Sequence, residues 1–179
     1  MSTSRPPPTA SAAALPSPAE PIFFQVGLKK LVLMYLVTFG VYEVAWFYFN
    51  WKHIQSRRER RISAPLRSVF FPLTSYGVFR AIDEQAKKND IATSVRAGPL
   101  ALGVLVLTPL WNLPMRYWYL ALIGVLPLVF AQRAVTRINA TIAPSSGTNT
   151  RFSRLNIIGV VLGGAALIAS IVFALLFDQ

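Results

Sequence analysis

Long apolar runs alternate with polar, basic segments along this chain. A helix of about twenty apolar residues, rising about 1.5 Å per residue, crosses a hydrocarbon core of roughly 30 Å. The second and third runs are short, contain Pro109 and Pro127, and are separated by a tight turn, so they are expected to form an antiparallel hairpin. The pattern predicts an all-α integral membrane bundle of about four spans. The predicted spans cover residues 31–51, 98–114, 117–132 and 155–177.

The first apolar run has two interpretations. As one helix over residues 31–51 it is long enough to span, and the aromatic residues of its second half favour the membrane–water boundary. Alternatively, Gly40 turns the chain and makes the run a re-entrant hairpin, since the residues before that glycine are too few to span alone. The two interpretations place the N-terminal tail on opposite sides of the membrane.

An amphipathic segment lies between the first and second runs. Its apolar side chains recur at helical spacing, whereas Arg67, Arg80, Asp83 and Lys87 fall elsewhere. This pattern predicts a helix over residues 65–88 that lies in the membrane interface on the cytoplasmic side and is broken near Pro72. The apolar positions are Leu66, Val69, Phe70, Leu73, Tyr76, Phe79 and Ile82.

Charge is segregated from the apolar runs. The chain is 54% apolar and 14% charged, against roughly 25% charged in an average globular protein. Residues 52–96 hold ten basic and four acidic residues, a net of +6, and residues 133–154 hold four basic residues and no acidic one. By the positive-inside rule both segments lie in the cytoplasm, so the chain is expected in a bacterial inner membrane.

The +11 net charge therefore predicts contact with anionic lipid rather than with nucleic acid. The candidate headgroup-contacting residues are Arg57, Arg58, Arg60 and Arg61.

The N-terminal region is rich in Pro, Ala and Ser. Residues 1–21 lack the apolar core of a secretory signal and are predicted to be a disordered tail, which leaves residues 22–179 as one membrane domain. With four spans this tail lies on the non-cytoplasmic side of the membrane, with Lys29 and Lys30 at that boundary, against the charge rule. A re-entrant first run removes that conflict.

Glu43 is the ionisable side chain placed deepest in an apolar run, and it shares a helical face with Asn50. Burial at this depth favours the neutral acid over the carboxylate. The residue is interpreted first as a hydrogen-bonding group that holds helices together. A proton or ion route is the alternative, and a position near the interface is a third.

The last run carries a stripe of small residues that begins with a Gly-Val-Val-Leu-Gly sequence. Such a stripe lets two helix backbones approach closely, so it predicts a packing surface. The partner helix is either in the same chain or in another copy. The stripe comprises Gly159, Gly163, Ala166 and Ser170.

Groups for catalysis are scarce. The chain has no cysteine, which excludes disulfides, thiol catalysis and Cys-ligated metals. The sole histidine, His53, has no second ligand at metal-binding spacing. No phosphate-binding loop or hydrolase motif occurs. We therefore predict no catalytic residues, no metal site and no cofactor.

Residues 22–82 resemble a group of proteobacterial membrane proteins of unknown function. The resemblance is carried by "LKKLVLMYLVTFGVYEVAWFYFNWKHI" and "RRISAPLRSVFFPLTSYGVFRAI". The group shares a Thr-Phe-Gly-x-Tyr-Glu-x-x-Trp-Phe-Tyr-x-Asn-Trp signature, which here falls on residues 38–51 and includes Glu43 and Asn50. The resemblance over residues 22–82 covers about a third of the chain. It implies a bacterial membrane protein and no particular activity.

The sequence thus favours a non-enzymatic inner-membrane protein, either an accessory or scaffold subunit or a lipid-interacting protein. A small transporter or channel component that uses Glu43 is the alternative. A membrane-embedded enzyme is the least favoured class, because no paired acid–base groups are found. The expected partners are anionic lipid headgroups and either a second copy or another membrane protein.

Overall fold

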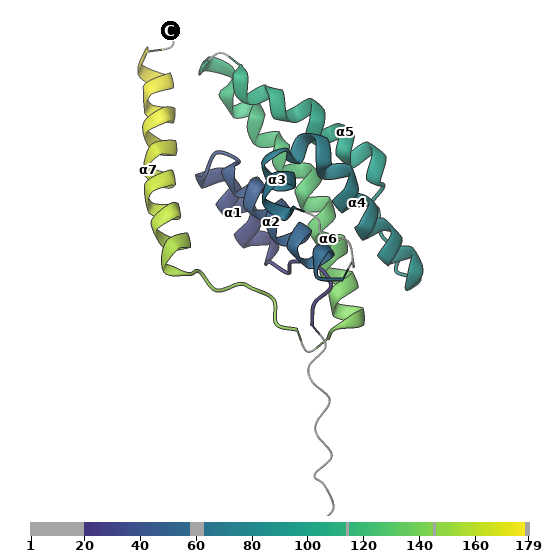
Figure 1. Cartoon of the computed structure of the whole chain (residues 1–179). Helices are drawn as coiled ribbons and strands as arrows, with labels where there is room; N and C mark the ends of the chain where they lie inside the picture. The colour runs from purple at the N-terminus through teal and green to yellow at the C-terminus, as the bar shows by residue number, and fades with distance from the viewer. Residues whose placement is uncertain (1–19, 58–62, 114, 145, 178–179) are drawn as a thin grey trace, which may run out of the picture.

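The structure is a computed structural model that describes residues 20–57, 63–113, 115–144 and 146–177. Its regular elements are helices, which confirms the all-α class (Figure 1). Almost all of the predicted tail, residues 1–21, lies outside the described residues. In chain order the elements are α1 (Leu28–Val37), α2 (Val41–Gln55), α3 (Ala64–Val69), α4 (Phe71–Lys88), α5 (Ala97–Leu107), η1 (Thr108–Asn112), η2 (Met115–Gly124), α6 (Val125–Ile142) and α7 (Arg154–Phe177).

The first apolar run is two helices rather than one, so the prediction of an uninterrupted helix over residues 31–51 is wrong. The break follows α1, where Gly40 has a φ of 81° and donates its N–H to the Tyr35 carbonyl at 2.8 Å. A Cβ atom at Gly40 would lie 2.8 Å from Cζ2 of Trp111. Left-handed backbone and a close neighbour both require glycine here. This break is the one that the hairpin interpretation places at Gly40.

The amphipathic segment also forms two helices, α3 and α4, which meet at Phe70. The second half of α4 buries Val78, Phe79 and Ile82 and packs against α2, α5 and α6. The first half of the segment has a different environment, because its large apolar side chains are exposed. These exposed residues are Leu66, Val69, Phe70, Leu73 and Tyr76.

The second and third apolar runs form a helical hairpin in which η1 packs against η2 and α5 packs against α6. The third helix does not end at residue 132 as predicted but continues to Ile142. Its continuation is amphipathic: Val135 and Ile138 are buried, whereas Arg133 and Arg137 are exposed. The stretch that follows residue 132, which contains two arginines, is therefore a helix with one apolar face.

One continuous helical stretch, Tyr119–Ile142, is long and apolar enough to cross a membrane by length and composition, within the described residues. Part of this stretch is buried inside the protein, and a core helix of a soluble protein passes the same test. Ala97–Asn112 and Asn156–Ser170 are shorter apolar stretches by the same measure.

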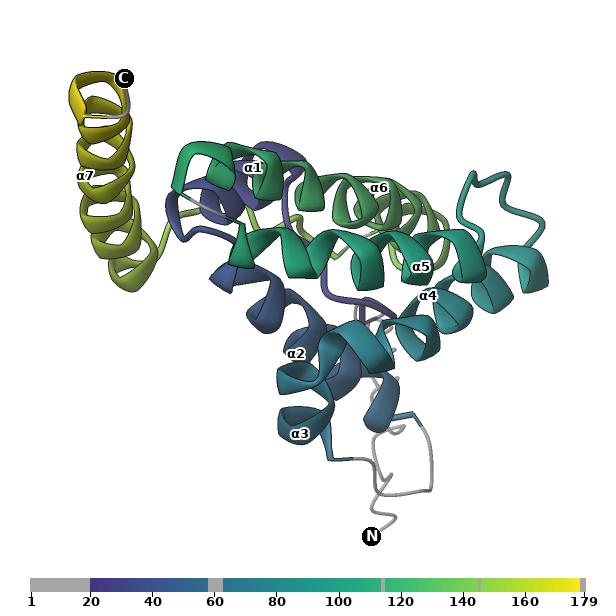
Figure 2. The ribbon, with the colours of Figure 1, turned by 90° about the horizontal axis from the view of Figure 1, so that it is seen from above.

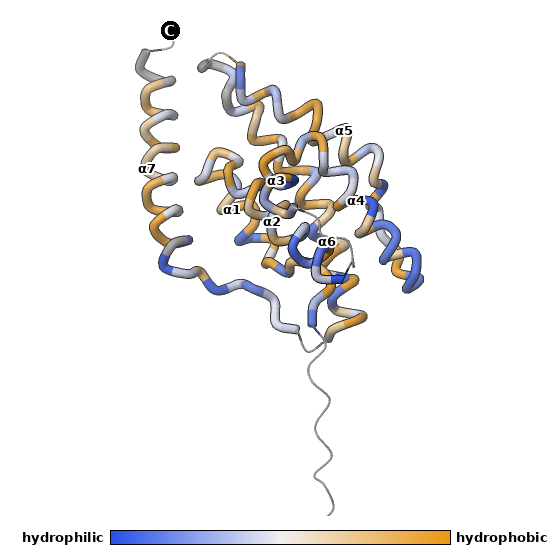
Figure 3. The backbone as a smooth tube through the Cα atoms, in the orientation of Figure 1, coloured by the Kyte–Doolittle hydropathy of each residue, from blue (hydrophilic) through white to orange (hydrophobic). Residues whose placement is uncertain are grey.

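The last helix, α7, packs on α1 and otherwise stands beside the bundle (Figures 1 and 2). The end of η1 and the end of α7 lie at the top of Figure 1, and the linker before α7 lies at the lower end of the helical part. Hydrophilic segments gather at that lower end, at the beginning of α7 and the end of α4 (Figure 3).

Candidate functional site

Three buried side-chain amides hold the segment that precedes α1. This N-terminal segment, residues 20–27, has no helical structure and contacts both α2 and α6. Its polar backbone groups are therefore satisfied by side chains rather than by a helix. The amides belong to Asn50 on α2 and to Gln132 and Asn139 on α6, and all three are fully buried.

Each amide has at least two hydrogen bonds. Asn139 accepts from the backbone N–H of Ile22 at 3.0 Å and donates to the carbonyl of Phe23 at 2.9 Å. Gln132 donates to the carbonyl of Val26 at 3.0 Å and accepts from the indole of Trp46 at 2.7 Å. These two side-chain amides thus form hydrogen bonds with backbone groups of the N-terminal segment.

Asn50 completes the set from the opposite helix. Its Oδ1 accepts from the N–H of Phe24 at 3.3 Å and its Nδ2 donates to the carbonyl of Trp46 at 2.9 Å. Asn50 was singled out by sequence, whereas Gln132, the last residue of a predicted span, and Asn139, in a stretch taken for a loop, were missed. Their seven-residue spacing, which puts both on one helical face, was the available signal.

The N-terminal segment also binds the linker before α7, residues 146–153. The N–H of Gly27 donates to Asn149 O and the N–H of Asn149 donates to Gln25 O, both at 3.2 Å. The buried ammonium of Lys30 donates to Asn149 Oδ1 at 2.9 Å and to the carbonyl of Arg151 at 2.6 Å. The beginning of α1 and the beginning of α7 are therefore neighbours.

The end of α2 lies on this same side. The guanidinium of Arg57 donates to the carbonyl of Pro21 at 3.0 Å. Arg57 thus holds the N-terminal segment, while Arg58, Arg60 and Arg61 lie outside the described residues. The N-terminal segment thus contacts the end of α2 through Pro21, and it leads into the start of α1, which contacts the linker.

Glu43 is buried where the α1–α2 pair meets the α5–α6 hairpin. The space beside it is lined by Tyr35 of α1, by Thr108 and Trp111 of η1 and by Gly124 of η2. This space is too narrow to admit a sphere the size of water. Glu43 and Asn50 are not brought together, because Asn50 contacts the N-terminal segment instead.

The corner between α3 and α4 exposes large apolar side chains. Leu73 is 74% exposed and Val69 is 64% exposed. On the same helix as Val69, the exposed guanidinium of Arg67 lies 4.7 Å from the centroid of the Trp51 ring, a cation–π contact that joins α3 to α2. The corner therefore presents an apolar surface beside a positive charge.

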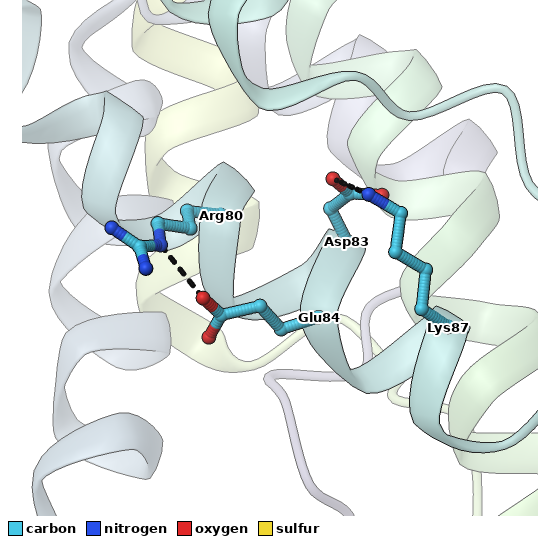
Figure 4. A network of polar contacts seen from close by, with 4 residues as sticks. All are labelled: Arg80, Asp83, Glu84 and Lys87. Atoms are coloured by element: carbon cyan, nitrogen blue, oxygen red, sulfur yellow. Dashed lines mark hydrogen bonds and ion pairs between the residues drawn. The ribbon is translucent and has the colours of Figure 1, made fainter.

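The far end of α4 has a polar surface. Arg80 and Glu84 form an ion pair at 2.6 Å, and Lys87 and Asp83 form one at 2.8 Å (Figure 4). Both pairs join residues four apart on one helix. The helix α4 thus passes from an apolar corner to an ionic end.

Two of the small residues on α7 face α1. A Cβ atom at Gly163 would overlap the carbonyl of Val37, and one at Gly159 would lie 3.8 Å from Cε of Met34. Ala166 is exposed, and Ser170 is half-buried and donates to the Ala166 carbonyl at 2.9 Å. The first two residues of this stripe therefore contact a helix of the same chain.

His53 lies near the end of α2 beside Arg57. Burial lowers the pKa of His53, and the nearby Arg57 guanidinium lowers this pKa further. Across the described ranges, no three His, Asp or Glu residues gather as metal ligands.

No family model, curated protein or solved structure matches the chain. The function is therefore inferred from the contacts within the molecule.

Proposed function

We propose that this chain is a non-enzymatic, multi-pass protein of the bacterial inner membrane that interacts with lipid. Three membrane-crossing stretches are assigned to α5–η1, η2–α6 and α7, and the α1–α2 pair is a re-entrant hairpin. The resemblance of residues 38–51 to proteobacterial membrane proteins supports the bacterial assignment.

The exposed α3–α4 corner carries the lipid-interacting part of this proposal. Exposure of Leu66, Val69, Phe70 and Leu73 on one corner would favour aggregation in water. The acyl region of a leaflet covers these side chains, while Arg67 and the ionic end of α4 remain close to headgroups and water. The corner thus enters the leaflet without crossing the membrane.

The positions of the basic residues support a cytoplasmic location for the lower end of Figure 1. Lys30 of α1 contacts Arg151 of the linker, which lies at this end in Figure 1, and Arg57 at the end of α2 contacts the N-terminal segment. Basic residues accumulate on the cytoplasmic side of inner-membrane proteins. A re-entrant α1–α2 pair keeps all three on that side, and a single-span first run would not.

A packing role for Glu43 is favoured over ion transport. A transport site needs a path wide enough for ions or water, and the space beside Glu43 is narrower than a water molecule. Glu43 therefore helps to join the α1–α2 hairpin to the α5–α6 hairpin. This favours a scaffold or accessory protein over a small transporter or channel component.

Site-directed labelling tests the proposed insertion of the corner. The chain has no cysteine, so single substitutions give single labels. A spin label at Leu73→Cys in lipid nanodiscs should be accessible to oxygen and protected from a water-soluble nickel reagent. The matched control is Lys87→Cys, since Lys87 also has an exposed side chain but lies at the ionic end of α4. This label should show the opposite accessibility, and equal exposure of both labels to the nickel reagent would contradict the proposal.

A further inference from the structure

A pocket lies between the first turn of α1 and the linker before α7. Its volume is about 440 Å³. Leu28, Leu33 and Phe152 supply apolar walls, and Leu33 and Phe152 are each 39% exposed at its mouth. Gly27 and Thr150 complete the lining together with Lys29 and Lys30. An elongated apolar group fits such walls better than a small ion does.

Lys30 lines this pocket and carries a buried ammonium. The residue is only 4% exposed, and its ammonium lies 5.5 Å from the centroid of the Phe152 ring. Two of its three N–H groups are used by Asn149 and by the carbonyl of Arg151, which leaves one for a ligand. No carboxylate pairs with Lys30 among the described residues. A buried charge without a counter-charge is costly, so an anion bound here would stabilise it.

The surroundings of the pocket are positive. Lys29 is exposed at its rim, and Arg151 and Arg154 are exposed on the adjoining linker and the first turn of α7. The sequence has no Asp or Glu between residues 21 and 42 or between residues 91 and 177. The N-terminal end of the α1 dipole adds further positive potential.

We propose that this pocket binds one anionic phospholipid of the cytoplasmic leaflet. The phosphate accepts a hydrogen bond from the remaining N–H of Lys30 and pairs with Lys29, and an acyl chain lies along Leu28, Leu33 and Phe152. A free phosphate would leave these apolar walls uncovered. The proposal rests on the membrane location proposed above, because only that location supplies the lipid.

Native mass spectrometry of the full chain in mild detergent tests the site, with added phosphatidylglycerol or phosphatidylcholine as probes. One phosphatidylglycerol should be retained per chain, and phosphatidylcholine should bind about tenfold more weakly. Millimolar inorganic phosphate should fail to displace the lipid. Equal retention of both lipids, or full displacement by phosphate, would overturn the proposal.

Three substitutions separate the pocket from general surface charge. Lys30→Gln removes the buried ammonium and should weaken phosphatidylglycerol binding about tenfold. Leu33→Glu alters an exposed wall position, so the chain should fold and yet lose the retained lipid. The control, Lys88→Gln, changes the charge by the same amount at the exposed end of α4 and should bind as the unmodified chain does. Unchanged retention by folded Leu33→Glu, or equal loss in Lys88→Gln, would refute a specific site.

Vesicle flotation distinguishes the failure of this site from failure of the membrane proposal. A chain that floats with reconstituted vesicles but retains no phosphatidylglycerol refutes the pocket alone. A chain that stays soluble without detergent and does not float refutes the membrane location as well.

Discussion

The indole N–H of Trp46 donates a hydrogen bond to the amide oxygen of Gln132 at 2.7 Å, across 86 residues of sequence. The same amide donates to the carbonyl of Val26, so one side chain joins α2, α6 and the N-terminal segment. Gln132→Leu leaves the buried indole and carbonyl without these partners, and each orphaned group costs about 1–3 kcal/mol. We expect a large fall in the detergent unfolding midpoint.

Arg133→Leu is the matched control for Gln132→Leu, because it changes the adjacent, exposed position of the same helix. Its effect should be small, within about 0.5 kcal/mol. Equal midpoints for the two variants would show that the amide contacts do not stabilise the fold.

Two substitutions at Glu43 separate the packing role from transport. Glu43→Gln keeps the shape and much of the hydrogen-bonding capacity and should unfold in detergent near the midpoint of the unmodified chain. Glu43→Ala leaves a cavity between the two hairpins. It should lower the free energy of unfolding by about 1–3 kcal/mol, and therefore also the midpoint. A folded Glu43→Gln variant that loses a pH-dependent flux seen with the unmodified chain in proteoliposomes would reverse our ranking.

The contact of α7 with α1 should be disrupted by a large side chain at Gly163 and unaffected by one at Gly164. Gly163→Leu places atoms where the Val37 carbonyl lies, whereas Gly164→Leu meets nothing within 4 Å. Crosslinking between α1 and α7, with a cysteine introduced in each helix, should be lost in the first variant and kept in the second. Leu162→Ile should also be tolerated, and equal crosslinking in all variants would remove the packing assignment.

The free energy of unfolding should decrease at acidic pH because of His53. The lowered pKa means that the folded protein prefers neutral His53, while the unfolded chain binds a proton near its usual pKa of 6.5. Unfolding is therefore favoured as the pH falls below about 6.5. The thermal midpoint in detergent should decrease between about pH 7.5 and pH 5, and His53→Gln should reduce this decrease. An identical pH profile for both proteins would exclude His53 as a source.

The length of the apolar runs, together with the helical spacing of apolar residues in 65–88, predicted the helical class. The break at Gly40 was visible as an alternative, since glycine is the residue that adopts positive φ without strain. Periodicity could not choose between the hairpin and a single helix. That choice depends on Trp111, which lies against Gly40 and comes from a distant part of the chain.

The amide cluster was largely hidden from sequence reasoning. Arg133 and Arg137 suggested a loop. The helix α6 nevertheless continues through both residues, because Val135 and Ile138 on its other face are buried. The N-terminal segment has no periodic signal, since its backbone is satisfied by Gln132 and Asn139 across more than a hundred residues. Such pairings depend on tertiary structure, which local patterns do not encode.

Labelling from each side of the membrane tests the proposed re-entrant path of α1–α2 most directly. Single cysteines at Lys29, Ser56 and Ser153 should react with an impermeant maleimide only when the cytoplasmic face is open. A cysteine at Asn112, the last residue of η1, should react from the opposite face. With a re-entrant α1–α2 pair, Lys29→Cys and Ser56→Cys should be labelled from the same side. Labelling of these two positions from opposite sides would show that the first apolar run crosses the membrane, and would contradict the account.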